Sequence, residues 1–326
     1  MGYEANIGEG YLKFKNFSNL VNSNPQIRDV RLDNFGEMFL NPELAPIIEY
    51  AYKKNIKISC DTGVNLNYVT DEILESLVKH RFSSLTCSMD GASDSTYKIY
   101  RVGGDFKEVV NNIRKINRYK KKYNSKFPNL KWQFIVFGHN EHEIPIAKEM
   151  AKSLNMEFYT KMSWDKAYSP IKDKNFVMAQ TGWPCVTRAE HEQLIGKNCM
   201  RGVCYILWHS PRVSWDGKVS GCCWNTWSEF GGNVFLDGYI NSINGEKINY
   251  AKQMLLGKAE PHEDIPCSTC EIYLKLRKTK DYLTLSEIFR YQSVSHKIFA
   301  LLYRKLGLKR FKNLIIKNKK GLCLNQ

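Results

Sequence analysis

The sequence predicts an α/β protein in which a parallel β-sheet comes first and a smaller cysteine-rich domain follows. Short β-branched or aromatic runs alternate with amphipathic stretches between residues 29 and 160. Each strand-and-helix pair occupies roughly 30 residues, which is the length of a βα unit. After about residue 175 the composition changes, and Gly, Trp and Cys become frequent. We therefore expect right-handed βα units before this point and a second domain after it.

The predicted elements of the first part follow one another in a regular order. The predicted strands are 29–35, 55–61, 83–90, 131–138 and 156–162, and the predicted helices between them are 42–54, 70–80, 105–122 and 143–154. Thr70 is a suitable N-cap, because its hydroxyl can accept from the first turn of its helix. Residues 11–23 predict a further helix that no strand precedes. We therefore expect the chain to begin partway through a βα unit.

The second part predicts shorter elements. The segment "SWDGKVSGCCW" (214–224) is typical of a β-hairpin with Asp216-Gly217 at its turn. The segment "TLSE" (284–287) has the pattern of a capping box at the start of a helix. We expect three regions: 1–178 with the sheet, 179–278 with the cysteines, and 279–326 as a basic amphipathic helical tail.

The cysteine content bears on the compartment and on the chemistry. The chain starts without a basic segment followed by an apolar one, and no apolar run is long enough to cross a bilayer. We expect a cytoplasmic protein, in which the ten cysteines stay reduced. Clustered cysteines are then better explained as metal ligands or catalytic thiols than as disulfides.

Four cysteines have the spacing of a metal site. Cys267 and Cys270 form a Cys-x-x-Cys turn, and the predicted hairpin would bring Cys204 and Cys222 together, one on each side. Four thiolates suit an iron–sulfur cluster or zinc, and the ligands alone do not separate the two. The other explanation, isolated buried thiols, applies to Cys60, Cys87 and Cys323.

The order of motifs around these cysteines resembles the SPASM domain, which is the C-terminal module of many radical S-adenosylmethionine (radical SAM) enzymes. The matching segments are "CYILWHSPRVSWDGKVSGCCW", "GGNVF" and "MLLGKAEPHEDIPCSTC". The resemblance implies that Cys204, Cys222, Cys267 and Cys270 ligate an auxiliary [4Fe–4S] cluster, with Cys223 as a substitute for Cys222.

The first part resembles the radical SAM fold, a partial (β/α) TIM-like barrel. The segments "LDNFGEMFLNPEL" (32–44) and "CSMDGASDSTYKIYRVGGDF" (87–106) carry this resemblance. It implies that Gly36 and Glu37 receive the amino group of S-adenosylmethionine. It also implies that Ser88 and Asp90 face this cofactor and that Arg101 pairs with its carboxylate.

The chain departs from this family in one respect. The family binds its catalytic cluster through a Cys-x-x-x-Cys-x-x-Cys loop after the first strand, and no such spacing occurs among the ten cysteines. The first strand is missing from the same place, so we expect the N-terminus to be truncated or its start to be assigned too far downstream. S-adenosylmethionine and a second [4Fe–4S] cluster are expected only if that region is present.

The sequence defines the reaction and the partners less closely than the fold. The resemblance implies reductive cleavage of S-adenosylmethionine to a radical that takes a hydrogen atom from a peptide or small-molecule substrate, with a flavodoxin or ferredoxin as reductant. Residues 275–326 hold fourteen Lys and Arg and two acids, which is compatible with peripheral contact to an anionic membrane. No recognition helix or aromatic platform favours nucleic acid. The alternative function is a non-catalytic binding protein stabilised by an iron–sulfur cluster or zinc, with a basic tail for anionic partners.

Overall fold

The computed structural model describes residues 7–33 and 35–291, which form two compact units. We call Tyr11–His191 the α/β unit, and we call Ile7–Gly10 together with 192–291 the cysteine unit. No helix in either described part is long and apolar enough to cross a membrane. The predicted tail beyond residue 291 lies outside the described residues, as does Cys323.

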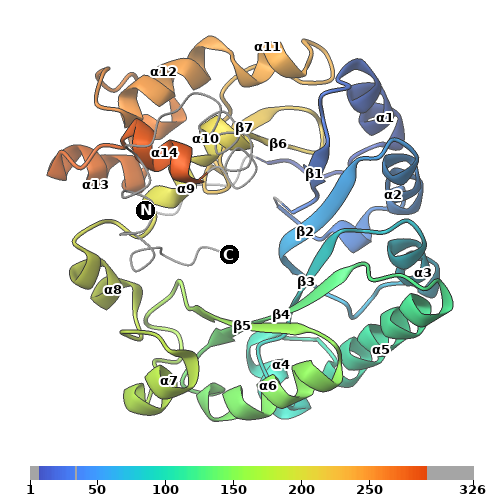
Figure 1. Ribbon diagram of the computed structural model, residues 1–326. Helices are drawn as coiled ribbons and strands as arrows, with labels where there is room; N and C mark the ends of the chain where they lie inside the picture. Colours follow the sequence, from blue (N-terminus) through green and yellow to red (C-terminus); the bar gives the residue numbers. More distant parts are fainter. Residues whose placement is uncertain (1–6, 34, 292–326) are drawn as a thin grey trace, which may run out of the picture. The chain divides into compact units, whose positions relative to one another are not determined.

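The α/β unit contains a single sheet of five parallel strands in the order β1-β2-β3-β4-β5 (Figure 1). Its elements are α1 (Phe14–Ser23), β1 (Asp29–Arg31), the 3₁₀ helix η1 (Met38–Leu40), α2 (Leu44–Lys53), β2 (Lys57–Val64), α3 (Asp71–Lys79), β3 (Ser84–Ser88), α4 (Asp94–Tyr100), α5 (Phe106–Lys122), β4 (Asn129–Val136), η2 (Glu141–Glu143), α6 (Ile144–Ser153), β5 (Glu157–Met162) and α7 (Lys174–Thr181). Helix α8 (Arg188–Ile195) begins in this unit and ends in the cysteine unit. The predicted α/β fold with a parallel sheet is therefore confirmed.

Two strands are shorter than predicted, and side chains explain why. β1 ends at Arg31 because the Asp33 carboxylate, rather than a backbone carbonyl, accepts from the Asp61 N–H, at 2.8 Å. β3 ends at Ser88 because the Asp90 carboxylate accepts from the Ile135 N–H in the same manner, at 2.7 Å. Aspartates thus end the backbone ladder at the carboxyl ends of two strands.

The two faces of the sheet differ in polarity. One face carries Leu85, Trp132 and Phe134, which are fully buried in a core shared with the surrounding helices. α5 contributes Val109, Ile113 and other apolar residues to that core, and Figure 1 shows α2, α3 and α5 on the outer side of the curved sheet. Residues at alternate positions therefore point to the opposite, concave face.

The cysteine unit has little regular structure. Its elements are α9 (Arg201–Cys204), α10 (Ile206–His209), β6 (Arg212–Val213), β7 (Val219–Gly221), α11 (Tyr239–Ile243), α12 (Glu246–Leu255), η3 (Pro266–Thr269), α13 (Glu271–Thr279) and α14 (Leu285–Tyr291). β6 and β7 form the predicted antiparallel hairpin, and Gly217 at its turn has a φ of +92°. The predicted capping box also forms, because Thr284 and Glu287 each accept from the backbone N–H of the other.

The N-terminal segment packs on this hairpin. The indole Nε1 of Trp215 donates to the carbonyl of Ile7 at 3.3 Å. Gly10 lies so close to the indole that a Cβ there would be 2.4 Å from a ring carbon. Residue 10 must therefore be glycine for the indole to keep this position.

Candidate functional site

The carboxyl ends of the five strands bring the predicted cofactor residues to one edge of the sheet. Gly36 and Glu37 follow β1, Ser88 ends β3, and Asp90 lies just beyond it. Arg101 follows α4, the helix after β3. In (β/α) folds this edge carries the chemistry, because the loops that follow parallel strands all meet there.

Glu37 is held by backbone groups of two segments. Its Oε2 accepts from the Asn65 N–H at 2.7 Å, and its Oε1 accepts from the Phe39 N–H at 3.2 Å. Burial raises the pKa of Glu37, while these two hydrogen bonds and the charge of Arg101 oppose the rise. Gly36 has a φ of +77°, so the turn before Glu37 favours glycine.

Asp90 and Arg101 form an ion pair at the same edge. Asp90 is fully buried, and its Oδ2 accepts from Arg101 Nε at 2.7 Å and from Nη2 at 2.6 Å. Its other oxygen accepts from the Ile135 N–H. Burial raises the pKa of Asp90, and Arg101 opposes this rise. Both oxygens of Asp90 are therefore used inside the fold, whereas Arg101 keeps 29% of its side chain exposed.

Ser88 lies on the concave face beside a glycine. A Cβ at Gly63 would be 2.1 Å from the Ser88 hydroxyl, and Gly63 has a φ of +114°. Glycine is required here on both grounds. Gly63 belongs to the Asp61-Thr62-Gly63 triplet of β2, so β2 and β3 approach closely at the hydroxyl of Ser88.

The concave face also holds polar residues that the sequence analysis did not single out. Gln133 is paired in register with Ser88 on one side and Tyr159 on the other, so the three side chains share this face. The Tyr159 hydroxyl donates to Gln133 Oε1 at 3.1 Å. Burial raises the pKa of Tyr159. A buried glutamine within the apolar run "KWQFIVFG" was the available signal, because β4 is otherwise typical of a core strand.

The four predicted metal ligands all belong to the cysteine unit, and their charges influence one another. Burial raises the pKa of Cys204 well above the usual thiol range, and negative charge on Cys222, Cys267 or Cys270 raises it further. Cys267 is affected in the same way by Cys222 and Cys270, and Cys222 by Cys270. Since such effects decrease with distance, the four thiols belong to the same region of the cysteine unit. Cys223, the predicted substitute, affects only Cys222 among them.

The local geometry of one cysteine differs from the prediction. Cys204 ends α9, and strand β6 begins only at Arg212, so Cys204 does not face Cys222 across the hairpin. Cys204, Cys267 and Cys270 are buried, while Cys222 is half-buried. Among the described residues, no three His, Cys, Asp or Glu side chains are arranged to hold a single metal ion.

Comparison with solved structures identifies the class of fold. The chain has the fold of radical SAM enzymes, as its resemblance predicted. SuiB of Streptococcus suis bound to S-adenosylmethionine matches with a TM-score of 0.56 at 9% identity, over 83% of this chain and 67% of that one. SuiB bound to its precursor peptide SuiA matches with a TM-score of 0.54 at 10% identity, over 82% and 65%.

The chain thus spans about two thirds of the length of these SuiB structures. No protein-family model matches the sequence. No curated protein matches it significantly either.

Proposed function

We propose that the protein is a radical SAM/SPASM-type iron–sulfur protein, in which Cys204, Cys222, Cys267 and Cys270 ligate an auxiliary [4Fe–4S] cluster. The observation that supports the proposal is the mutual electrostatic influence of these four cysteines within the cysteine unit. Negative charges on these cysteines would repel one another, and a bound cationic centre would remove this repulsion. A cluster of four irons spreads its thiolates more widely than a single ion does, which suits neighbouring thiols that do not converge on one point.

The strand-end residues support binding of S-adenosylmethionine. Glu37, held by the Asn65 and Phe39 backbone, presents a carboxylate to the amino group of the cofactor, with a carbonyl from Gly36. Asp90 accepts hydrogen bonds from the Nε and Nη2 atoms of Arg101. No described residue accepts a hydrogen bond from its Nη1 atom. Arg101 therefore retains a donor for the cofactor carboxylate, and we assign Asp90 the role of positioning Arg101.

The cofactor bound to a reduced catalytic cluster supplies the one-electron chemistry that starts hydrogen abstraction. The printed sequence contains no Cys-x-x-x-Cys-x-x-Cys, so this activity is proposed only for a form of the protein that provides such a loop. We assign electron delivery to a small reductant such as a flavodoxin or ferredoxin. A peptide substrate is favoured over a small molecule by the likeness to SuiB, which binds a precursor peptide.

The test is anaerobic reconstitution with ferrous iron and sulfide, followed by metal and sulfide analysis. We expect about four iron and four sulfide per chain, as a [4Fe–4S] cluster requires. Replacing any one of the four ligands with serine should remove most of the iron. Cys87→Ala, in the core of the α/β unit, is the control and should keep it. Cys223→Ala tests the alternative ligand and should also keep it.

The second candidate is the non-catalytic, metal-stabilised binding protein. The same experiment separates the two, because a zinc protein would bind about one zinc per chain and no sulfide. That result, with the same four cysteines required, would contradict the iron–sulfur assignment.

A further inference from the structure

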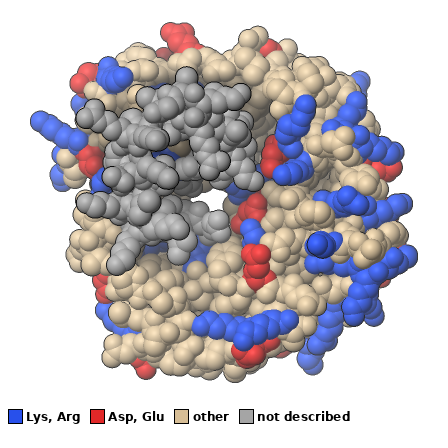
Figure 2. Space-filling model, viewed as in Figure 1, with Lys and Arg blue, Asp and Glu red and all other residues tan. Residues whose placement is uncertain are grey.

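The outer surface of α5 carries positively charged side chains that form no ion pairs within the described structure. The helix contains seven Lys and Arg and a single acid, Glu108. Arg114, Arg118 and Lys121 are exposed and lie on one side of the helix, and we call these three the α5 basic face. Figure 2 shows Lys and Arg gathered over this part of the molecule. Among the described residues, none forms an ion pair or a hydrogen bond with the side chains of these three.

Two acids of α3 pair with other cations of α5. Asp71 of α3 pairs with Lys115 at 2.7 Å, and Glu75 of α3 pairs with Lys122 at 2.6 Å. Glu75 also accepts from the Tyr123 hydroxyl. Asp71 and Glu75 therefore pair with Lys115 and Lys122 and not with the α5 basic face.

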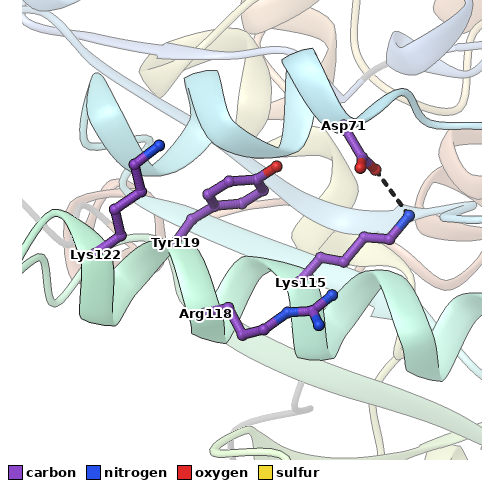
Figure 3. A pocket seen from close by; sticks show the side chains of 5 residues that line it. All are labelled: Asp71, Lys115, Arg118, Tyr119 and Lys122. Atoms are coloured by element: carbon purple, nitrogen blue, oxygen red, sulfur yellow. Dashed lines mark hydrogen bonds and ion pairs between the residues drawn. The ribbon is translucent and has the colours of Figure 1, made fainter.

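A groove of about 310 Å³ lies beside the basic face, between α3 and α5 (Figure 3). Its lining residues are Asp71, Lys115, Arg118, Tyr119 and Lys122. The figure shows Lys115, Tyr119 and Lys122 extending toward α3, while Arg118 lies along α5, and Lys115 is bonded to Asp71. The groove therefore offers a concave, cationic wall with room for a carboxylate side chain.

Helix stability does not explain the basic face. Lys121 and its neighbours in the last turn interact favourably with the helix dipole. Arg114 and Arg118, however, lie in the middle of the helix at spacing i,i+4, where like charges destabilise it. The sequence thus keeps an unfavourable pair that nothing within the described chain compensates.

We propose that the α5 basic face and its groove form a docking surface for an acidic segment of a partner protein. Arg114 and Lys121 are seven residues apart, or about 10 Å along the helix axis, so the face is a linear stripe. Arginine binds carboxylates through a planar fork, which suits Asp and Glu side chains. The groove is concave, whereas a membrane is flat. Its single half-buried tyrosine gives no row of aromatic rings on which nucleic-acid bases would stack. The proposal is independent of the metal site.

The test uses the full chain and a fluorescent polyglutamate of 20 residues as the probe. We expect the triple variant Arg114→Glu/Arg118→Glu/Lys121→Glu to weaken binding at least tenfold at 100 mM salt. The matched control Lys15→Glu/Lys54→Glu/Lys152→Glu makes the same change in net charge at exposed sites on other helices. It should weaken binding less than threefold. Equal weakening by both triples would assign the attraction to net charge and overturn the proposal.

Two further measurements locate the contact and identify the occupant. Carbodiimide coupling, which joins a carboxylate to a lysine in direct contact, should link the probe to Lys121 and Lys122 more than to Lys15 or Lys152. Tighter binding of single-stranded DNA or phosphatidylserine vesicles through the same three residues would overturn the assignment of an acidic protein.

A neutral variant separates binding from stability. Arg114→Gln/Arg118→Gln removes the like-charge pair, so it should raise the thermal midpoint slightly while weakening the binding of polyglutamate. A lower midpoint would mean that the arginines support the helix, and the proposal would fail.

Discussion

The two units hold their folds in different ways. The α/β unit has a continuous apolar core that extends from Phe17 to Val186 and surrounds one face of a five-stranded sheet. The cysteine unit has strands of two and three residues, short helices, and a buried arginine between two carboxylates. The first unit is therefore stabilised mainly by one continuous apolar core. The second adds the buried ion pairs of Arg201 to a smaller set of buried apolar residues, Ile248, Met254 and Leu276 among them. Small domains with limited cores commonly need a further staple.

Removal of the metal should have the largest effect and should affect one unit only. Structural four-ligand sites contribute roughly 10 kcal/mol of folding free energy. We expect a chelator to unfold the cysteine unit of the reconstituted protein while the sheet of the α/β unit remains. Hydrogen exchange measured by mass spectrometry checks this, because protection should disappear from α12 and α13 and persist in β3 and β4. Equal protection in both units after chelation would contradict the claim that the metal stabilises the cysteine unit alone.

A core truncation should affect the other unit. Trp132 is fully buried, and its indole donates to the Met89 carbonyl at 2.6 Å. Trp132→Ala should lower the free energy of unfolding of the α/β unit by about 3–5 kcal/mol. Urea denaturation followed by circular dichroism measures this loss. The control Tyr68→Ala, at a side chain that is 73% exposed, should change stability by less than about 1 kcal/mol.

The buried arginine of the cysteine unit provides the matching test. Arg201 pairs with Asp281 and with Glu287, the latter at 2.9 Å, and donates to the Tyr282 carbonyl at 3.1 Å. Arg201→Met should lower stability by about 3 kcal/mol, because breaking a buried pair leaves its partners uncompensated. Arg277→Met removes an exposed pair with Glu260 and should cost less than about 1 kcal/mol. Thermal unfolding of the three proteins gives the comparison, and similar losses for both variants would contradict it.

The ion pairs of Arg201 with Asp281 and Glu287 also predict a pH effect on stability. Burial opposes ionisation of Glu287, but hydrogen bonds from Lys197 and Thr284 and the charge of Arg201 outweigh it and lower its pKa to about 2. Since an unfolded glutamate titrates near pH 4.3, the stabilisation is complete above that pH and is lost as the pH falls toward 2. Urea denaturation between pH 6 and pH 2 should therefore show a steeper loss for the wild type than for Glu287→Gln. If the stability of the wild type and of Glu287→Gln falls in parallel with pH, Glu287 is not the cause of the acid sensitivity.

Local sequence patterns were sufficient to predict most of the α/β unit. Buried parallel strands appear in the sequence as short apolar runs, and the predicted cap at Thr70 accepts from the Ile73 N–H. The strand ends were less predictable, because Asp33 and Asp90 take over backbone hydrogen bonds from partners 28 and 45 residues away. A single sequence carries no signal for pairings at such distances.

The candidate sites were predictable in part for the same reason. Residue types and spacing selected the four cysteines, but not the helical position of Cys204. The sequence singled out Arg101, but its pairing with Asp90 depends on how α4 returns to the strand ends. Gln133 and Tyr159 were missed because their roles depend on strand register, which places them beside Ser88.

The contact between Trp215 and the segment Ile7–Gly10 also bears on biosynthesis. The cysteine unit is assembled from residues on both sides of the α/β unit, so in the chain the α/β unit is an insertion within it. During translation the segment Ile7–Gly10 cannot form this contact until about 200 further residues, Trp215 among them, have been synthesised. Domains generally fold as units in the order of synthesis, so the inserted sheet should fold first. Under the proposed iron–sulfur assignment, the cysteines would then acquire their cluster late, after the α/β unit has formed.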